Sequence, residues 1–175
     1  MTLADVLIDE ARTTYAVTER LFRLVSDADL AWKPAAPGTA WMTMGQLLMH
    51  CASFGCGKAV RGFVTGDWGV ELAEYGDAGE HTHLPAATEL PAVASVEEAL
   101  RFLEADRIVA IDSIAQADCT QLLAARRAAP WGGPELSLFQ HLLRMIAHLA
   151  QHKGQLFYYL KLMGRDVRTV DLWGA

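Results

Sequence analysis

The sequence is poor in cysteine and proline and contains no long apolar run. It has 3 Cys and 6 Pro in 175 residues, and charged residues interrupt every hydrophobic segment. Because the cysteines are odd in number and lack a Cys-x-x-Cys spacing, neither a disulfide framework nor a thiolate zinc site is predicted. A membrane-spanning helix needs about 20 consecutive apolar residues, so no membrane partner is expected. These absences favour a cytoplasmic protein.

Positive charge is also scarce. The chain has 15 Lys and Arg against 21 Asp and Glu, a formal net charge of -6, and no basic run along its length. Such a surface repels a phosphate backbone, so a nucleic-acid partner is not expected. The 52% hydrophobic and 21% charged residues are typical of a folded globular protein. At this length we expect residues 1–175 to form a single domain.

Three segments carry the same helix-initiation signal. In each, a Ser or Thr is followed three residues later by Glu or Gln, so that both side chains can satisfy backbone groups of the first helical turn. The pairs are Thr43 and Gln46, Ser95 and Glu98, and Ser137 and Gln140. Together with the helical spacing of apolar residues, these signals predict helices at about residues 3–26, 44–65, 96–117 and 138–163.

No segment shows the convincing alternation of a β-strand. The connections 27–42 and 66–94 are long and contain several prolines and glycines. Loops of this length inside a compact domain are often functional, so we expect residues 66–94 to shape the entrance to a site. Four long helices joined by one or two long connections predict an all-α fold, a four-helix bundle with long crossover connections.

The segment with the clearest chemical content carries His148 and His152. A spacing of four places both imidazoles on one face of a helix, one turn apart. Both can then bind one metal ion at about 2 Å from each nitrogen. The pair lies on the apolar seam of the predicted helix, where an unpartnered polar ring would be costly. The alternative is that both are core residues hydrogen-bonded to their neighbours, and the spacing alone does not exclude it.

A third candidate ligand is His50, which lies in the run Leu47-Leu-Met-His-Cys51 on an apolar face. One inward histidine on one helix and an inward pair on another is how metal sites are built in helix bundles. Three neutral nitrogens leave at least one position for water or substrate, the open arrangement of a catalytic metal. We therefore predict that His50, His148 and His152 bind one divalent metal, with zinc, nickel and iron all compatible with three imidazoles.

These residues, in this order, resemble the DinB/YfiT-like metalloenzyme family. The resemblance is carried by Trp41, Thr43, His50, the run His148-x-x-x-His152-Lys-Gly-Gln155 and the apolar helix end Leu160–Gly164. It covers nearly the whole chain. The sequence departs from the family at Lys153, where Arg is usual, although the positive charge is kept. The resemblance implies an up-down bundle with one metal on His50, His148 and His152.

The resemblance also implies a function. Characterised members include thiol-cofactor-dependent transferases and isomerases, such as mycothiol-dependent maleylpyruvate isomerase and bacillithiol transferases. A metal-dependent transferase or isomerase acting on a small electrophilic molecule is therefore expected, with a low-molecular-weight thiol as a further cofactor. No carboxylate has a spacing that marks it as a general base, so no catalytic side chain is assigned. The alternatives are a non-catalytic metal- or small-molecule-binding bundle, for instance in a stress response, and a structural module. A homodimer stays open.

Other polar residues are weaker candidates. His141 lies two turns before the paired histidines, which favours a pocket or core role over metal binding. His81 and His83 alternate in the long connection, where a solvated loop is favoured over a metal site. Cys51 projects about 100° around the helix from its histidine neighbour, and a buried inert thiol is the favoured interpretation. Gln155 either hydrogen-bonds a group behind the ligands or faces solvent.

Overall fold

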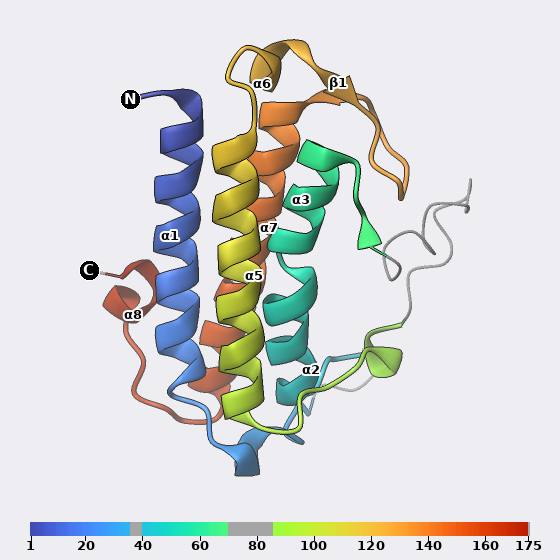
Figure 1. The fold of residues 1–175 in the computed structure, drawn as a ribbon. Helices are drawn as coiled ribbons and strands as arrows, with labels where there is room; N and C mark the ends of the chain where they lie inside the picture. Colours follow the sequence, from blue (N-terminus) through green and yellow to red (C-terminus); the bar gives the residue numbers. More distant parts are fainter. Residues whose placement is uncertain (36–39, 70–85, 175) are drawn as a thin grey trace.

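Four long helical segments build the molecule. The computed structural model describes residues 1–35, 40–69 and 86–174. The bundle consists of α1 (Leu3–Phe22), α2 (Met44–Met49) with its continuation α3 (Gly57–Thr65), α5 (Val96–Gln116) and α7 (Leu138–Leu162). In Figure 1, α1 and α7 run down the page, whereas α2, α3 and α5 run up. The consecutive helices α3 and α5 therefore point the same way. The predicted all-α four-helix bundle with a long crossover is confirmed.

Shorter elements join the long helices. They are 3₁₀ turns at Asp27–Asp29 and Ala87–Glu89, α6 (Gln121–Ala124), α8 (Thr169–Trp173), β1 (Arg126–Arg127) and β2 (Leu136–Ser137). The two strands pair antiparallel, with Arg126 opposite Ser137. The sequence gives no sign of this hairpin, because two-residue strands are too short to show an alternation. The C-terminal α8 was also not predicted, and it is held to α7 where the ammonium of Lys153 lies 5.8 Å from the Trp173 ring centroid.

The predicted capping boxes begin two of the long helices. The Thr43 hydroxyl accepts from the backbone N–H of Gln46, and the Gln46 side chain accepts from the backbone N–H of Thr43. Ser137 and Gln140 make the same two bonds at the start of α7. At the start of α5 the serine hydroxyl also caps, but the acid three residues later accepts from the backbone N–H of Ala94 instead. The sequence therefore placed these helix starts correctly, since the signal is local.

The second long helix is not continuous, contrary to the prediction for residues 44–65. After α2 the chain forms a π-helical segment (His50–Phe54), which is wider than an α-helix and holds one more residue in each turn. The helical path then breaks at Cys56, where φ is -152° and ψ is -62°, before α3 begins. A Cβ on Gly55 would lie 2.5 Å from the backbone oxygen of Cys51, so the segment requires a glycine at this position.

Asp106 of α5 fills the break in the helix. Its carboxylate accepts from the backbone N–H groups of Gly57 at 2.8 Å and Lys58 at 3.2 Å, the first N–H groups of α3. It also accepts from the Tyr15 hydroxyl of α1 at 2.6 Å. A Cβ on Gly57 would overlap the backbone oxygen of Asp106. One buried carboxylate thus ties three helices together at the point where the second helix is interrupted.

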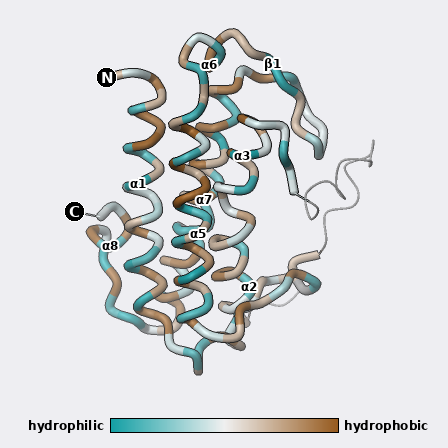
Figure 2. Tube along the Cα trace, in the orientation of Figure 1, coloured by the Kyte–Doolittle hydropathy of each residue, from teal (hydrophilic) through white to brown (hydrophobic). Residues whose placement is uncertain are grey.

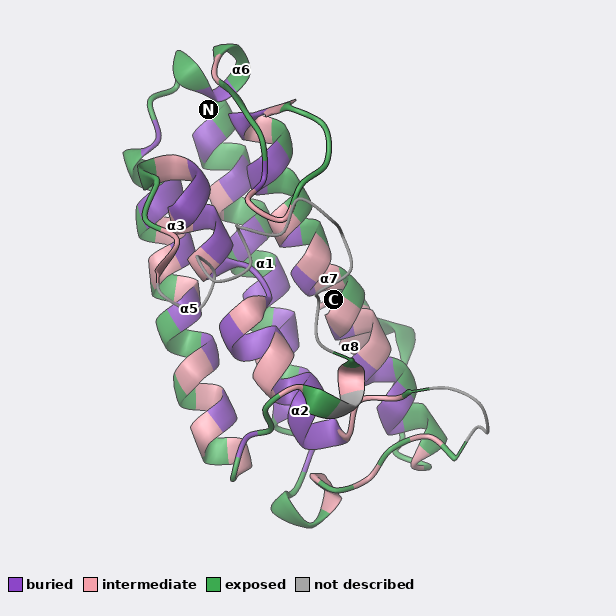
Figure 3. Ribbon diagram, turned by 90° about the vertical axis from the view of Figure 1, so that its right-hand side faces the viewer, coloured by how far each residue is buried: buried purple, intermediate pink, exposed green. Residues whose placement is uncertain are grey.

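The interior of the bundle is apolar. Hydrophobic and hydrophilic residues alternate around the long helices in Figure 2, and Figure 3 shows buried positions along each of them. Side chains that are almost fully buried come from every long segment, including Leu21, Leu47, Phe63, Ile114 and Leu142. All three cysteines are free. Within the described ranges, none of the helices combines the length and apolar character that crossing a membrane requires.

Candidate metal centre

The three predicted histidines come together between two segments of the bundle. His50 is the first residue of the π-helical segment, and His148 and His152 lie one turn apart on α7. One ring nitrogen from each residue belongs to a group whose atoms all lie within 4.8 Å of one another. The Nε2 atoms of His148 and His152 are 3.0 Å apart. All three rings are half-buried, so none of the predicted ligands faces bulk solvent.

The tautomer of His148 is set by the backbone. Its Nδ1 lies 2.9 Å from the carbonyl oxygen of Gly55, the residue that follows the π-helical segment. A carbonyl oxygen only accepts, so Nδ1 must donate and carry the proton. The lone pair of the neutral ring is then on Nε2, which points toward the other histidines. The same backbone segment therefore carries one histidine of the cluster and orients another.

A longer hydrogen-bond chain sets the tautomer of His152. The Tyr159 hydroxyl donates to the carbonyl of Met42 at 3.1 Å, which leaves its oxygen to accept from the Gln155 amide nitrogen at 3.2 Å. The Gln155 amide oxygen then lies 3.0 Å from Nδ1 of His152 and accepts from it. Because the amide oxygen only accepts, Nδ1 of His152 carries the proton, and the lone pair of the neutral ring is on Nε2. The backbone carbonyl of Met42, three hydrogen bonds away, thus determines which nitrogen of His152 can bind a metal.

The resulting arrangement fits a cation. Two Nε2 lone pairs 3.0 Å apart repel each other unless a positive charge lies between them. The Nδ1 atom of His50 is buried and has no hydrogen-bond partner among the described residues. A divalent metal satisfies all three rings, since imidazole nitrogen is a good donor for zinc, nickel and iron. The residues present therefore fit the metal that the family resemblance implies.

Burial favours the neutral form of His50 and His152. The pKa of His50 is lowered to about 4, mainly by burial and in addition by the neighbouring His152 and His148. Burial also lowers the pKa of His152, with His148 adding to the effect and the hydrogen bond to Gln155 opposing it. A neutral imidazole is the form that coordinates a metal, so at pH 7 His50 and His152 need to release few protons on binding one.

A cavity of about 260 Å³ opens on one side of the cluster. Its wall includes His50 and His148, together with Phe54, Lys58, Trp131 and Met145. Trp131 comes from the loop between β1 and β2, which the sequence did not identify as part of a site. The entrance was predicted in the connection 66–94, but the described parts of that connection do not line this cavity. Residues 70–85 lie outside the described residues.

The weaker candidate residues named from the sequence do not belong to the histidine cluster in the described structure. His141 is buried, stacks on Phe63 at 4.0 Å between ring centroids and lies with Nε2 2.8 Å from the carbonyl of Arg127. It holds the β-hairpin to the bundle, in agreement with the predicted core role. Cys51 is fully buried, and burial raises the pKa of its thiol far above the ordinary value, which makes it inert. His81 and His83 lie outside the described residues.

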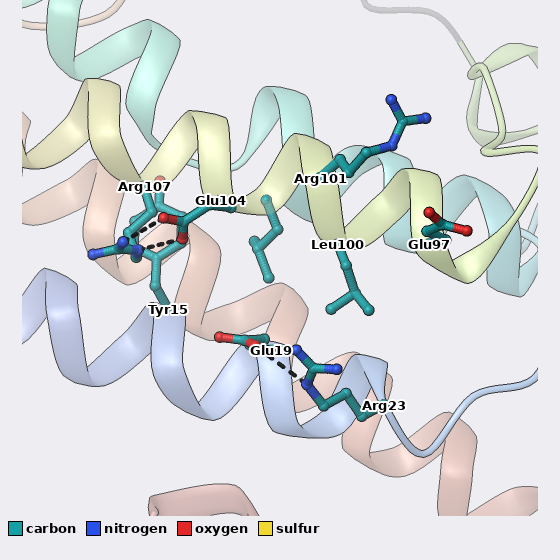
Figure 4. A pocket seen from close by; sticks show the side chains of 9 residues that line it. Tyr15, Glu19, Arg23, Glu97, Leu100, Arg101, Glu104 and Arg107 are labelled. Atoms are coloured by element: carbon teal, nitrogen blue, oxygen red, sulfur yellow. Dashed lines mark hydrogen bonds and ion pairs between the residues drawn. The ribbon is translucent and has the colours of Figure 1, made fainter.

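A second cavity, of about 410 Å³ between α1 and α5, has a different character. Figure 4 shows that acidic and basic side chains face each other along it. Arg23 pairs with Glu19, Arg107 pairs with Glu104, and the Tyr15 hydroxyl donates to the buried carboxylate of α5. These charges neutralise one another, and among the described residues the cavity contains no cluster able to hold a metal. We assign it a structural role.

The fold and the cluster define the class of the protein: a helix bundle with three candidate metal-binding histidines on two neighbouring segments. The chain belongs to the DinB superfamily, whose family model matches residues 10–156. It is similar in structure to a DinB-like protein from Bacillus cereus, with a TM-score of 0.64 and 16% identity over 94% of this chain and 95% of that chain. At this identity the likeness concerns the fold. No curated protein matches the chain.

Replacing Gln155 with leucine is expected to weaken zinc binding about 10- to 100-fold, the usual effect of removing a hydrogen-bond partner behind a histidine ligand. The variant removes the acceptor of the His152 Nδ1 proton and keeps a side chain of similar size. Gln155→Glu keeps an acceptor and should retain affinity. Competition with a chromophoric chelator measures the dissociation constant. The matched control is Gln151→Leu, an exposed position on the same helix; equal affinity in all variants would contradict the proposed tautomer control.

Proposed function

We propose that this chain is a metal-dependent enzyme that binds one divalent metal through His50, His148 and His152. Its reaction is the transfer or isomerisation of a small electrophilic molecule with the help of a low-molecular-weight thiol. The observation that carries the proposal is the 3.0 Å distance between the Nε2 atoms of His148 and His152, beside a cavity that His50 and His148 line. A closed structural site would need a fourth protein ligand, and the described residues offer three.

The residues around the cavity have separate roles. When bound, a divalent metal lowers the pKa of a coordinated thiol or water and provides a nucleophile near neutral pH. The carbonyl of Gly55 and the amide of Gln155 hold two of the rings in the required tautomer. Phe54, Trp131 and Met145 form apolar walls that exclude water from the reacting group. No acid or base is assigned to the reaction.

Cobalt substitution tests this function. Protein purified without a nickel column is loaded with cobalt(II), and its visible spectrum is followed while the thiols 2-mercaptoethanol and cysteine are added. An open coordination position predicts intense charge-transfer bands in the near ultraviolet when a thiolate binds, together with release of one proton for each thiol bound. A His148→Ala variant is expected to lose these bands.

The outcomes separate the candidate functions. Cobalt binding with thiol-dependent bands supports the transferase or isomerase, and conversion of an electrophile by the thiol-loaded protein would extend it to catalysis. Cobalt binding without any thiol effect favours the non-catalytic alternative, a metal- or small-molecule-binding bundle. Failure of the wild-type protein to bind cobalt, zinc, nickel or iron would leave the histidines as core residues and end the proposal.

A further inference from the structure

A third cavity, of about 710 Å³, lies between the connection that follows α1 and the C-terminal half of α7. It is larger than either cavity described above and falls within the range of about 300–1,000 Å³ that is typical of small-molecule sites. Of the described residues that line it, four are aromatic and none is a histidine. The aromatic residues are Trp32, Trp41, Tyr158 and Tyr159. The cavity is therefore separate from the one beside the histidine cluster.

The aromatic rings are arranged around one buried residue. Tyr159 is almost fully buried, and the rings of Trp32 and Trp41 pack against it at centroid distances of 5.3 Å and 6.4 Å. Both indole planes are steeply inclined to the phenol ring, by 72° and 69°, so neither contact is a stack. The indoles are half-buried, whereas Tyr158 and Leu162 at the border of the cavity are exposed. Aromatic and apolar surface at the border of a hollow is typical of a binding groove.

Hydrogen bonds fix the walls of this cavity in place. The backbone N–H of Met44 donates to the carbonyl of Trp32 at 2.7 Å, which ties the connection to the start of α2. The guanidinium of Arg165 donates to the carboxylate of Asp29 at 2.8 Å, which ties the same connection to the chain after α7. The bond from the Tyr159 hydroxyl to the segment before α2 adds a third link. A cavity held in this way is largely preformed, so a ligand loses little binding energy in ordering the protein.

The charge of the wall argues against a cationic ligand. Groups of aromatic rings bind either cations, over the ring faces, or other flat rings. Among the described residues that line this cavity, Lys33 is the charged one and none is a carboxylate. Such a wall offers nothing that neutralises a positive ligand. The complementary molecule is a planar aromatic compound without a positive charge.

Gln155 connects this cavity to the candidate metal centre. It lines the cavity, its amide oxygen accepts from Nδ1 of His152, and its amide nitrogen donates to the Tyr159 hydroxyl. The side chain of Gln155 is half-buried, so water that enters the cavity can compete for its amide. A ligand that covers Gln155 excludes this water and lowers the local dielectric, which strengthens the hydrogen bond to His152.

We propose that this cavity binds a planar aromatic molecule without a positive charge, and that the bound molecule strengthens metal binding through Gln155. The first half concerns a site that no histidine lines, so it stands without a metal. The second half rests on the proposed function, because it concerns the metal held by the three histidines. The ligand takes no part in the reaction and acts as an effector.

Isothermal titration calorimetry of chelator-treated protein at pH 7 tests the first half. The probes are 2-naphthoate and its saturated counterpart decahydro-2-naphthoate, which share one carbon skeleton and one carboxylate. Only the first is flat and aromatic, so a preference of about tenfold for 2-naphthoate is expected from two or more ring contacts. Trp32→Leu and Tyr158→Leu should each weaken its binding about two- to tenfold. Tyr158 is exposed, so its replacement does not threaten the fold.

Trp173→Leu is the matched control, because it replaces an exposed tryptophan that does not line the cavity. It should leave the affinity for 2-naphthoate unchanged. Equal affinity for the two anions, or an affinity for 2-naphthoate that neither ring variant lowers, overturns the aromatic site. Binding of phenyltrimethylammonium in preference to 2-naphthoate overturns the assigned charge of the ligand.

Chelator competition for zinc, with and without saturating 2-naphthoate, tests the second half. The zinc affinity of wild type should rise about fivefold, and 2-naphthoate should bind the zinc-loaded protein more tightly by the same factor. Gln155→Leu should still bind 2-naphthoate and gain no zinc affinity from it. A zinc affinity that 2-naphthoate does not raise in wild type, or raises equally in the variant, overturns the link and leaves the aromatic site standing. If wild type binds no zinc, the proposed function and the link both fail, and the calorimetry decides the aromatic site independently.

Discussion

Replacing His152 with alanine is expected to lower zinc affinity by more than about 100-fold and leave the protein helical. Removal of a direct ligand must cost more than removal of the hydrogen-bond partner behind it, which is about 10- to 100-fold. The bundle should persist because its stability comes from buried apolar side chains, and His152 is only half-buried. Elemental analysis gives the zinc content, and circular dichroism at 222 nm gives the helix content.

His141→Ala is the control for this experiment. It removes a histidine of the same helix that stacks on Phe63 and bonds to the carbonyl of Arg127. This variant should be less stable than wild type and should keep its zinc, the opposite of the His152 result. Unchanged zinc stoichiometry in His152→Ala would remove that residue from the ligand set.

Replacing Asp106 with alanine is expected to reduce the free energy of unfolding by about 3 kcal/mol or more. Two buried donors, the Tyr15 hydroxyl and the Gly57 N–H, lose their acceptor, and each such loss costs about 1–3 kcal/mol. The N–H of Lys58 loses its acceptor as well. Burial raises the pKa of Asp106, so the cost of holding a charge in the core offsets part of the gain in wild type. Urea denaturation followed by circular dichroism measures the change.

The matched control is Asp112→Ala, which removes an exposed aspartate from the same helix. Surface substitutions of this kind usually change stability by less than about 0.5 kcal/mol. If both variants unfold at the same urea concentration, the carboxylate of Asp106 does not stabilise the junction of α1, α3 and α5. A zinc titration of Asp106→Ala adds a second readout, because this junction follows directly on the segment that carries His50.

The parts of the fold that could be predicted from sequence depend on local signals. The capping pairs Thr43 with Gln46 and Ser137 with Gln140 act within one helical turn, so they mark the helix starts without knowledge of the rest of the chain. The break at Cys56 could not be predicted in this way. Its cause is the carboxylate of Asp106, 50 residues further along the chain, which replaces the helical partners of the first N–H groups of α3.

The same distinction applies to the site. The spacing of His148 and His152 placed both on one helix face, and the apolar surroundings of His50 indicated an inward position. What the sequence could not show is how the rings are oriented. The chain from His152 through Gln155 and Tyr159 ends at the carbonyl of Met42, a contact between residues 117 apart. Lys58 and Trp131 line the cavity because of tertiary packing, and neither belongs to a sequence motif that would have identified it.

The π-helical segment has a consequence for how this site can vary over evolution. A π turn holds one residue more than an α turn, so in sequence terms it is equivalent to a single-residue insertion in an ordinary helix. A deletion of one residue between His50 and Gly55 would therefore restore ordinary α-helical turns and keep the flanking residues on the same faces of the helix. What would change is the segment itself, which begins at His50 and is followed by Gly55, whose carbonyl accepts from Nδ1 of His148. A one-residue deletion is therefore expected to disturb the candidate metal centre more than the apolar core of the bundle.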